Sequence, residues 1–127
     1  MLVAYLSITG NCKRFVDNFD VESIEINPAN PLVNVNEDYI VISPTYEYEI
    51  TESINEFVEY NDNLKHFKGV VGSGNYNFND LYIFTAKDLS EKYKVPILHD
   101  FEYFGTDRDV EIVKEVLDKL AITRTEQ

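Results

Sequence analysis

Short apolar runs alternate along this chain with segments whose apolar residues recur at helical spacing, and this alternation restricts the possible folds more than any other feature. The runs at 2–6 and 39–43 have no polar alternation, which is typical of strands buried on both faces. Between such runs lie stripes like the one from Cys12 to Phe19, which has the spacing of a helix. Strands that alternate with helices indicate a parallel sheet, because parallel neighbours need crossover connections.

The pattern predicts five strands and four helices. The strands are expected at residues 2–6, 21–26, 39–43, 69–72 and 95–103. The helices are expected to carry the apolar stripes that begin with Cys12, Ile50, Tyr82 and Val110. Thr51 is a plausible N-cap of the second helix, and Thr106 opens the last helix, with Asp107 and Asp109 in its first turn. The sequence Gly72-Ser73-Gly74-Asn75 is predicted to break the fourth strand into a loop.

The connection between the second and third strands has no helical stripe. Its prolines indicate a loop at 27–31, and we expect residues 31–38 to form an irregular crossover. The predicted fold class is therefore α/β, a flavodoxin-like doubly wound five-stranded parallel sheet with strand order 2-1-3-4-5. In such sheets ligands bind outside the carboxyl ends of the strands, beside the switch point between the first and third strands. This rule gives the location of the candidate site.

Size and charge exclude several classes of protein. The chain of 127 residues, 44% of them hydrophobic, is expected to form a single domain over 1–127. One cysteine, Cys12, cannot make an intrachain disulfide, and no Cys/His cluster has metal-site spacing, so we expect a reducing cytoplasm and no metal. The run at 2–6 is too short for a signal peptide or a membrane span. A net charge of −12 makes nucleic acid and anionic membranes poor partners.

The turn after the first strand has the composition of an anion site. Ser7-Ile8-Thr9-Gly10-Asn11 places two hydroxyls and a glycine before a predicted helix. Backbone amides there can bind phosphate without a lysine, and Gly10 lets the backbone approach closely. A simple turn and N-cap that bind nothing would use the same residues. The pentapeptide alone does not separate the two interpretations.

Two further loops carry aromatic residues beside flexible or amide residues. Residues 44–49 follow the third strand and residues 73–79 follow the fourth. Such loops can enclose a flat heterocycle and reach its polar edge with backbone groups. For Tyr48 or Phe78 taken alone, ordinary packing is the favoured interpretation. Three such segments at one end of a sheet indicate a ligand site.

These segments together resemble the NrdI family. The resemblance is carried by Ser-x-Thr-Gly-Asn at 7–11, Pro-Thr-Tyr at 44–46, Gly-Ser-Gly-Asn-x-Asn-Phe at 72–78 and Phe-Glu-Tyr-Phe-Gly-Thr at 101–106, followed by Asp109-Val110. It covers the chain from Leu2 to about Leu120. The first turn indicates flavodoxins in general, and the segments at 72–78 and 101–106 are more specific.

The resemblance implies a non-covalent FMN site. Ser7, Thr9, Gly10 and Asn11 would hold the phosphate, with Ile8 and Cys12 completing the turn. The residues that would border the isoalloxazine on its two sides are Thr45, Tyr46, Glu47, Tyr48 and Glu49, and Gly74, Asn75, Tyr76, Asn77 and Phe78. No catalytic residue is assigned.

The resemblance also implies a function. NrdI proteins are flavoproteins that activate class Ib ribonucleotide reductase: reduced FMN reacts with dioxygen, and the superoxide formed supports assembly of the metal-radical cofactor of the NrdF subunit. The expected partners are NrdF, dioxygen and a reductant, either a flavin reductase or a thiol or ferredoxin system. We expect a monomer that acts as an accessory protein rather than as a stand-alone enzyme. The alternatives are an electron-transfer flavodoxin and an interaction domain that has lost FMN.

Some positions depart from the family pattern. Glu47-Tyr48-Glu49 has no glycine where family members commonly carry glycines beside the flavin N5, so a backbone flip there would cost more. Asn79 and Tyr76 replace a common glycine and a common basic residue. The two glutamates lead to the hypothesis that the reduced flavin has a low potential, because nearby carboxylates disfavour an anionic ring. The loops around Tyr48, Tyr76 and Phe101 are predicted to form the docking surface.

Three other groups are given structural roles. Cys12 lies near a predicted helix start, which could lower the pKa of its thiol. A phosphatase loop with a cysteine nucleophile needs an arginine six positions later, and position 18 is Asn18. We therefore favour a packing role for Cys12. His66 and His99 belong to no pattern with metal spacing. Asp107 and Asp109 are interpreted as partners of the helix dipole rather than as a metal pair.

Overall fold

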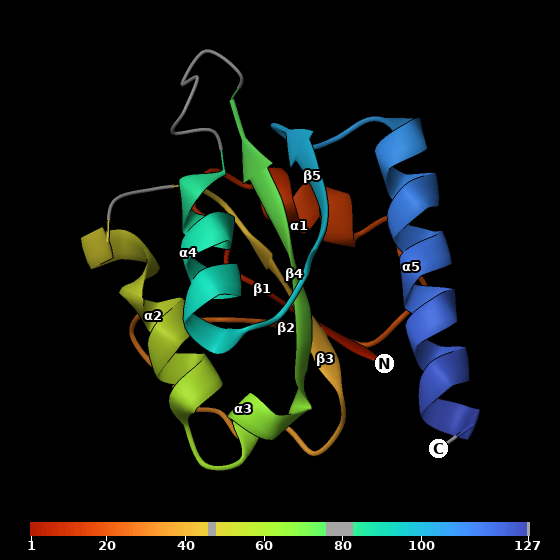
Figure 1. The fold of residues 1–127 in the computed structure, drawn as a ribbon. Helices are drawn as coiled ribbons and strands as arrows, with labels where there is room; N and C mark the ends of the chain where they lie inside the picture. The colour runs from red at the N-terminus through yellow and green to blue at the C-terminus, as the bar shows by residue number, and fades with distance from the viewer. Residues whose placement is uncertain (46–47, 76–82, 127) are drawn as a thin grey trace.

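The computed structural model describes residues 1–45, 48–75 and 83–126. Five strands form one parallel sheet in the order β2-β1-β3-β4-β5, which confirms the predicted flavodoxin-like topology (Figure 1). The strands are β1 (Leu2–Tyr5), β2 (Ser23–Glu25), β3 (Tyr39–Ser43), β4 (Phe67–Gly74) and β5 (Ile97–Glu102). Every residue of β1 and β3 is buried, as expected for the two apolar runs without alternation.

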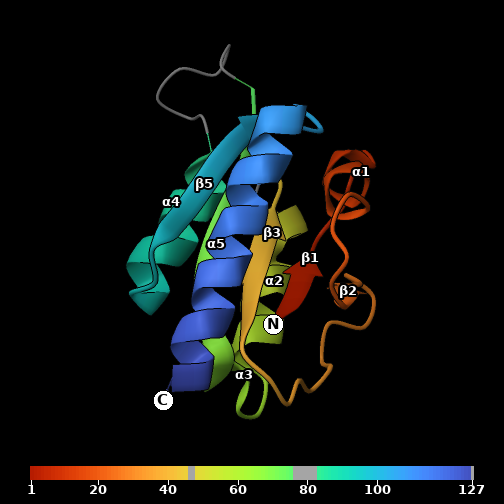
Figure 2. The same cartoon turned by 90° about the vertical axis from the view of Figure 1, so that its right-hand side faces the viewer.

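Helices cover both faces of the sheet (Figures 1 and 2). They are α1 (Asn11–Val16), α2 (Tyr48–Glu59), α3 (Asn63–His66), α4 (Phe84–Tyr93) and α5 (Asp107–Glu126). One core joins α1 and α5 to the sheet, and its centre is the stack of Phe15 on Phe101, with ring centroids 4.0 Å apart. The other core joins α2 and α4 to the opposite face through Phe57, Tyr39 and Leu89.

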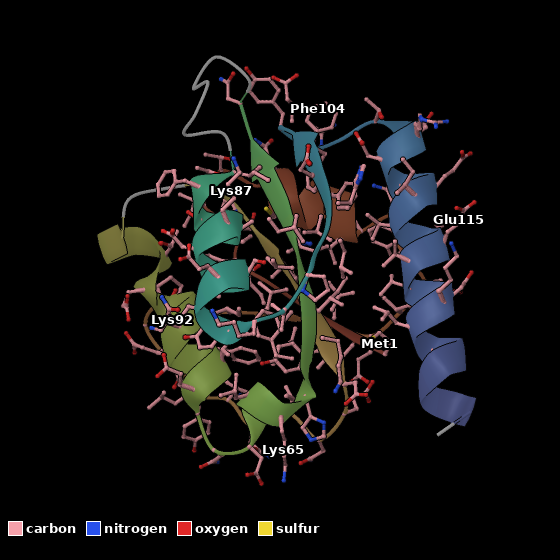
Figure 3. All side chains as sticks on the ribbon, viewed as in Figure 1. Met1, Lys65, Lys87, Lys92, Phe104 and Glu115 are labelled. Atoms are coloured by element: carbon pink, nitrogen blue, oxygen red, sulfur yellow. The ribbon has the colours of Figure 1, made fainter. Side chains whose placement is uncertain are left out.

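The irregular crossover at 31–38 is present, and a buried side chain holds it in place. Asn63 accepts a hydrogen bond from the Val35 amide (2.9 Å) and donates to the carbonyls of Val33 and Phe57 (both 2.8 Å). Its side chain therefore replaces the backbone pairing that a helix would supply. Figure 3 shows Lys65 of α3 at this amino end of the sheet and Phe104 near the carboxyl end.

Several predicted boundaries were wrong. The fourth strand does not break at Gly72 but continues to Gly74, because Gly72 and Ser73 pair with β5; a Cβ on Gly72 would lie 2.8 Å from Ala86 Cβ, so this glycine serves close packing and not a turn. Thr51 lies inside α2 and is not its N-cap, since the helix begins at Tyr48. The short helix α3 was not predicted.

Two further elements are shorter than predicted. The Asn18 side chain ends α1 before Phe19 by donating to the carbonyls of Arg14 and Phe15 (2.9 and 3.1 Å). Strand β5 spans only Ile97–Glu102, because Tyr103 has a positive φ of 53°. Tyr82, the first residue of the predicted third helical stripe, lies outside the described residues.

Candidate functional site

The turn between β1 and α1 leaves a row of backbone amides open. Gly10 has φ 91°, a left-handed conformation that suits glycine, and the Lys13 amide donates to Ser7 Oγ (3.3 Å). Within the described part of the chain, no acceptor faces the backbone N–H groups of residues 8–12. The side chains of Ile8 and Thr9 are exposed, so solvent reaches this turn. Five successive amides are therefore available to an anionic group.

Hydrogen bonds tie together the segments that follow the neighbouring strands. Thr45 Oγ1, after β3, donates to the carbonyl of Ser73 near the end of β4 (2.8 Å). The Ser73 hydroxyl donates to the carbonyl of Tyr103 after β5 (2.7 Å), and the Tyr103 amide donates to the carbonyl of Gly74 (3.1 Å). The carboxyl edge of the sheet is thus cross-linked from β3 to β5. Ser73 was not among the predicted site residues, because its sequence context indicated only a turn.

Cys12 is the second residue of α1 and lies directly after the β1–α1 turn. It is buried, and burial raises the pKa of its thiol to about 12, although a hydrogen bond with the Ser73 side chain acts in the opposite direction. A lowered pKa is therefore wrong for this cysteine, because desolvation outweighs any effect of the six-residue helix α1. The packing role is the one that the structure favours.

The structure places nine of the predicted site residues at the carboxyl edge of the sheet: Ser7, Ile8, Thr9, Gly10, Asn11, Cys12, Thr45, Gly74 and Asn75. Five others, Tyr46, Glu47, Tyr76, Asn77 and Phe78, lie outside the described residues. For Tyr48 and Glu49 only the backbone, in the first turn of α2, is described. The hypothesis about the two glutamates and the flavin potential stays a prediction.

The loop after β5 exposes different aromatic residues from the one predicted. Phe101 is 1% exposed, because its ring stacks on Phe15, so it cannot form part of a docking surface. Tyr103 and Phe104 are 49% and 43% exposed. The guanidinium of Arg14 lies 3.8 Å from the centre of the Phe104 ring. Both residues line a hollow of about 520 Å³ between the end of α1 on one side and this loop with the start of α5 on the other.

A capping network joins β5 to the start of α5. Asp109 accepts hydrogen bonds from the amide and hydroxyl of Thr106 (2.8 and 2.9 Å), and its other oxygen lies 2.8 Å from His99 Nε2. Burial acts to raise the pKa of Asp109, but the hydrogen bonds from His99 and Thr106 together lower it. The predicted opening of the helix by Thr106 is confirmed. The spacing Thr-x-x-Asp is the capping signal in the sequence, whereas nothing in it links His99 to this pair.

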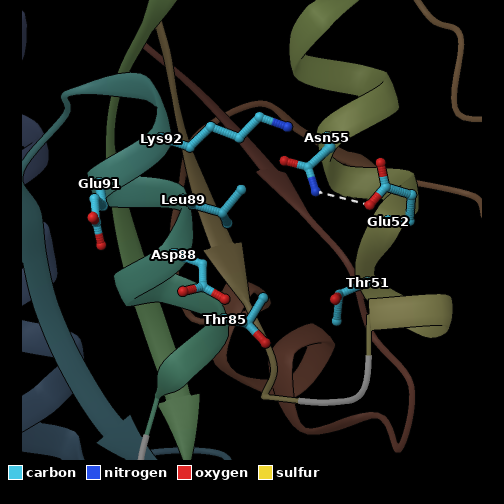
Figure 4. A pocket seen from close by; sticks show the side chains of 8 residues that line it. All are labelled: Thr51, Glu52, Asn55, Thr85, Asp88, Leu89, Glu91 and Lys92. Atoms are coloured by element: carbon cyan, nitrogen blue, oxygen red, sulfur yellow. Dashed lines mark hydrogen bonds between the residues drawn. The ribbon is translucent and has the colours of Figure 1, made fainter.

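A second hollow, of about 370 Å³, lies between α2 and α4 (Figure 4). The charged side chains that line it are Glu52, Asp88, Glu91 and Lys92. Three carboxylates against one ammonium make this hollow unsuited to a phosphate group. Among the residues that the structure describes, no three His, Cys, Asp or Glu side chains gather as metal ligands, and no helix is long and apolar enough to cross a membrane.

Comparison with known proteins gives a consistent result. The sequence profile of the family described as "NrdI Flavodoxin like" matches residues 3–115. Proteins named "Protein NrdI" from Bartonella henselae and Mycoplasma mycoides are 34% and 32% identical to this chain. The alignments cover 94% of both chains for the first, and 91% of this chain and 79% of the relative for the second. A solved short-chain flavodoxin associated with a bacterial microcompartment has a TM-score of 0.65 at 19% identity, with 96% of each chain covered, and shares the fold.

Proposed function

The chain belongs to the NrdI flavodoxin-like family, and we propose that it binds FMN and activates class Ib ribonucleotide reductase. The fold and the family imply a flavin cofactor. The observation that carries the choice of FMN is the row of open amides at residues 8–12, at the carboxyl edge of the sheet. A phosphate monoester is the part of FMN that other simple flavins lack, and amides in this arrangement suit it.

The residues of the turn fit a phosphate without a basic side chain. The ammonium of Lys13, two residues after the start of α1, already lies 3.3 Å from a carboxylate oxygen of Asp17. Around Gly10 a Cβ would meet nothing within 4 Å, so an anion has room to approach the backbone. The Ser7 hydroxyl accepts from the Lys13 amide and keeps its own proton for an anion. Backbone amides thus overcome the repulsion expected from a net charge of −12.

When bound, reduced FMN supplies the electrons that convert dioxygen to superoxide, the oxidant for the metal-radical cofactor of NrdF. In this proposal the chain orients the cofactor: residues 7–12 hold the phosphate, and residues 45–49 and 74–78 border the ring. The physiological reductant is a flavin reductase or a thiol or ferredoxin system. The protein acts as a cytoplasmic monomer in which residues 1–127 form one domain.

Comparison of FMN with riboflavin tests the binding site. Several charge-assisted hydrogen bonds to the phosphate should make riboflavin bind about 100-fold more weakly, or worse, in a fluorescence titration. Lys13→Gln should leave the FMN dissociation constant within about twofold, because amides and not this ammonium carry the site. Equal affinity for the two flavins would contradict the placement of the phosphate.

Activation is tested by reducing the FMN-loaded protein anaerobically and admitting oxygen. Flavin absorbance and superoxide are followed with and without a manganese-loaded NrdF subunit. Superoxide formation together with radical assembly in NrdF is the expected result. Flavin oxidation with ordinary electron exchange and no radical assembly would instead indicate an electron-transfer flavodoxin.

A further inference from the structure

One buried serine at the carboxyl end of β4 contacts three different segments. Ser73 is 5% exposed and pairs with Phe101 in the sheet. Its hydroxyl donates to the Tyr103 carbonyl (2.7 Å), and its carbonyl accepts from Thr45 Oγ1 (2.8 Å). We propose that Ser73 is a positioning residue, whose hydroxyl holds the loop after β5 against β4 and so sets the shape of the flavin site.

This inference rests on the proposed function, and the hydrogen-bonding capacity of a serine supports it. A hydroxyl has one proton to donate and lone pairs that can accept. The proton goes to the Tyr103 carbonyl. Alanine would remove this hydrogen bond while keeping the backbone carbonyl that accepts from Thr45. The substitution therefore tests the side chain alone.

The backbone of Tyr103 shows why this hydroxyl matters. Tyr103 has φ 53°, a left-handed conformation that residues with a Cβ seldom adopt. It is held on both sides, by the Ser73 hydroxyl at its carbonyl and by the Gly74 carbonyl at its amide (3.1 Å). Without the hydroxyl, the amide contact is the one hydrogen bond among the described residues that still opposes relaxation of Tyr103 toward a common conformation. The loop after β5 then separates from the edge of β4 that borders the flavin.

A second buried serine provides a matched control. Ser43 lies at the end of β3, beside Gly72 of β4, and is also buried. Its hydroxyl donates to the carbonyl of Pro44, the next residue in the chain (2.8 Å). This bond joins no distant segments. Ser43→Ala thus removes a buried hydroxyl from the same edge without releasing a loop.

The experiment compares S73A with S43A. In S73A we expect FMN to bind about tenfold more weakly, the equivalent of one lost hydrogen bond, and in S43A within about twofold of the wild type. At saturating FMN, the visible circular dichroism of the flavin should decrease in S73A and stay unchanged in S43A. In the protein without flavin, the Tyr103 amide should exchange its hydrogen about tenfold faster in S73A alone.

Tyr103→Gly supplies a rescue test, because glycine adopts a positive φ at little cost. In the Y103G background the effect of S73A on FMN affinity should fall below about threefold. An equal effect in both backgrounds, or equal affinities of S73A and S43A, would overturn the positioning role. If the wild type bound no FMN, the proposed function would fail, and hydrogen exchange at Tyr103 would still decide the role of Ser73.

Discussion

The two ends of the sheet are built differently. At the amino end, side chains close the structure: the buried Asn63 makes three hydrogen bonds to the crossover and to α2, and His66 Nδ1 lies 3.0 Å from Asp38. At the carboxyl end, Ser73 and Asp109 tie loops together, yet the amides of residues 8–12 have no acceptor among the described residues. At the amino end these polar groups stabilise the fold, whereas at the carboxyl end a row of backbone donors is left for a ligand.

The difference gives a rule for interpreting mutations. Changes that remove a hydrogen bond at the amino end should lower stability and leave flavin affinity unaltered, because both partners are internal. Changes that release or distort a loop at the carboxyl end should alter both quantities, because the same loops hold the fold and face the ligand. Variants that break this rule would show that the ends are coupled through the sheet.

Asn63→Leu should have the largest effect. Leucine fills a similar volume but removes the partner of the Val35 amide and of the Val33 carbonyl, and leaves the Phe57 carbonyl with its bond from the Tyr60 amide (3.3 Å). We expect a loss of about 3 to 5 kcal/mol in the free energy of unfolding, measured in urea, with FMN affinity of the folded fraction unchanged. Asn34→Ala is the control, since the one side-chain bond of Asn34 within the described ranges goes to the exposed Asn36. Weaker FMN binding in N63L would contradict the separation of the two ends.

Gly105→Ala should destabilise the carboxyl end. Gly105 has φ 76°, and a Cβ there would lie 2.6 Å from Cδ1 of Phe15, which is fixed by its stack on Phe101. Strain and overpacking together should cost about 2 to 4 kcal/mol in urea unfolding. Affinity for FMN should fall as well, because Phe15 belongs to α1, which begins at the turn with open amides.

Gly10→Ala separates backbone strain from overpacking. Gly10 has φ 91° but open space around it, so alanine should add strain of only about 1 to 2 kcal/mol. If G105A lost no more free energy of unfolding than G10A, the contact of the new Cβ with Phe15 would add nothing to the cost of backbone strain.

The sequence predicts what depends on local pattern. Strands buried on both faces, such as β1 and β3, and the turn at 7–11 are recognisable because their signals lie within a few residues. The continuation of β4 through Gly72 was missed, because a glycine that allows close packing against Ala86 has the same local signature as a glycine in a turn. The role of Asn63 could not be predicted, since its partners Val33 and Val35 lie 30 and 28 residues away.

Asp109→Asn should have a smaller, pH-dependent effect. The pKa of Asp109 is lowered in the folded protein, so its carboxylate stabilises the fold above the unfolded pKa of about 3.9 and loses this effect as the pH falls through the folded value. The free energy of unfolding of the wild type should exceed that of D109N by about 1 kcal/mol at pH 7, and this difference should shrink below about pH 4. Urea unfolding at a series of pH values from 3 to 7 measures the difference. A difference that stays constant over this range would show that the negative charge is not what matters.

Tyr39→Phe should have the smallest effect and the opposite sign. The Tyr39 hydroxyl is buried at the amino end and has no hydrogen-bond partner among the described residues, and burial raises its pKa. Removing it relieves a desolvation cost, so Y39F should be as stable as wild type or more stable by up to about 1 kcal/mol. Tyr93→Phe is the matched control, because the Tyr93 hydroxyl lies within hydrogen-bond distance of two acceptors, Asn55 Oδ1 (2.8 Å) and Glu59 Oε2 (2.6 Å), and its loss should destabilise by about 1 kcal/mol. If Y39F were less stable than the wild type, the Tyr39 hydroxyl would also stabilise the amino end, and the contrast between the two ends of the sheet would be stronger.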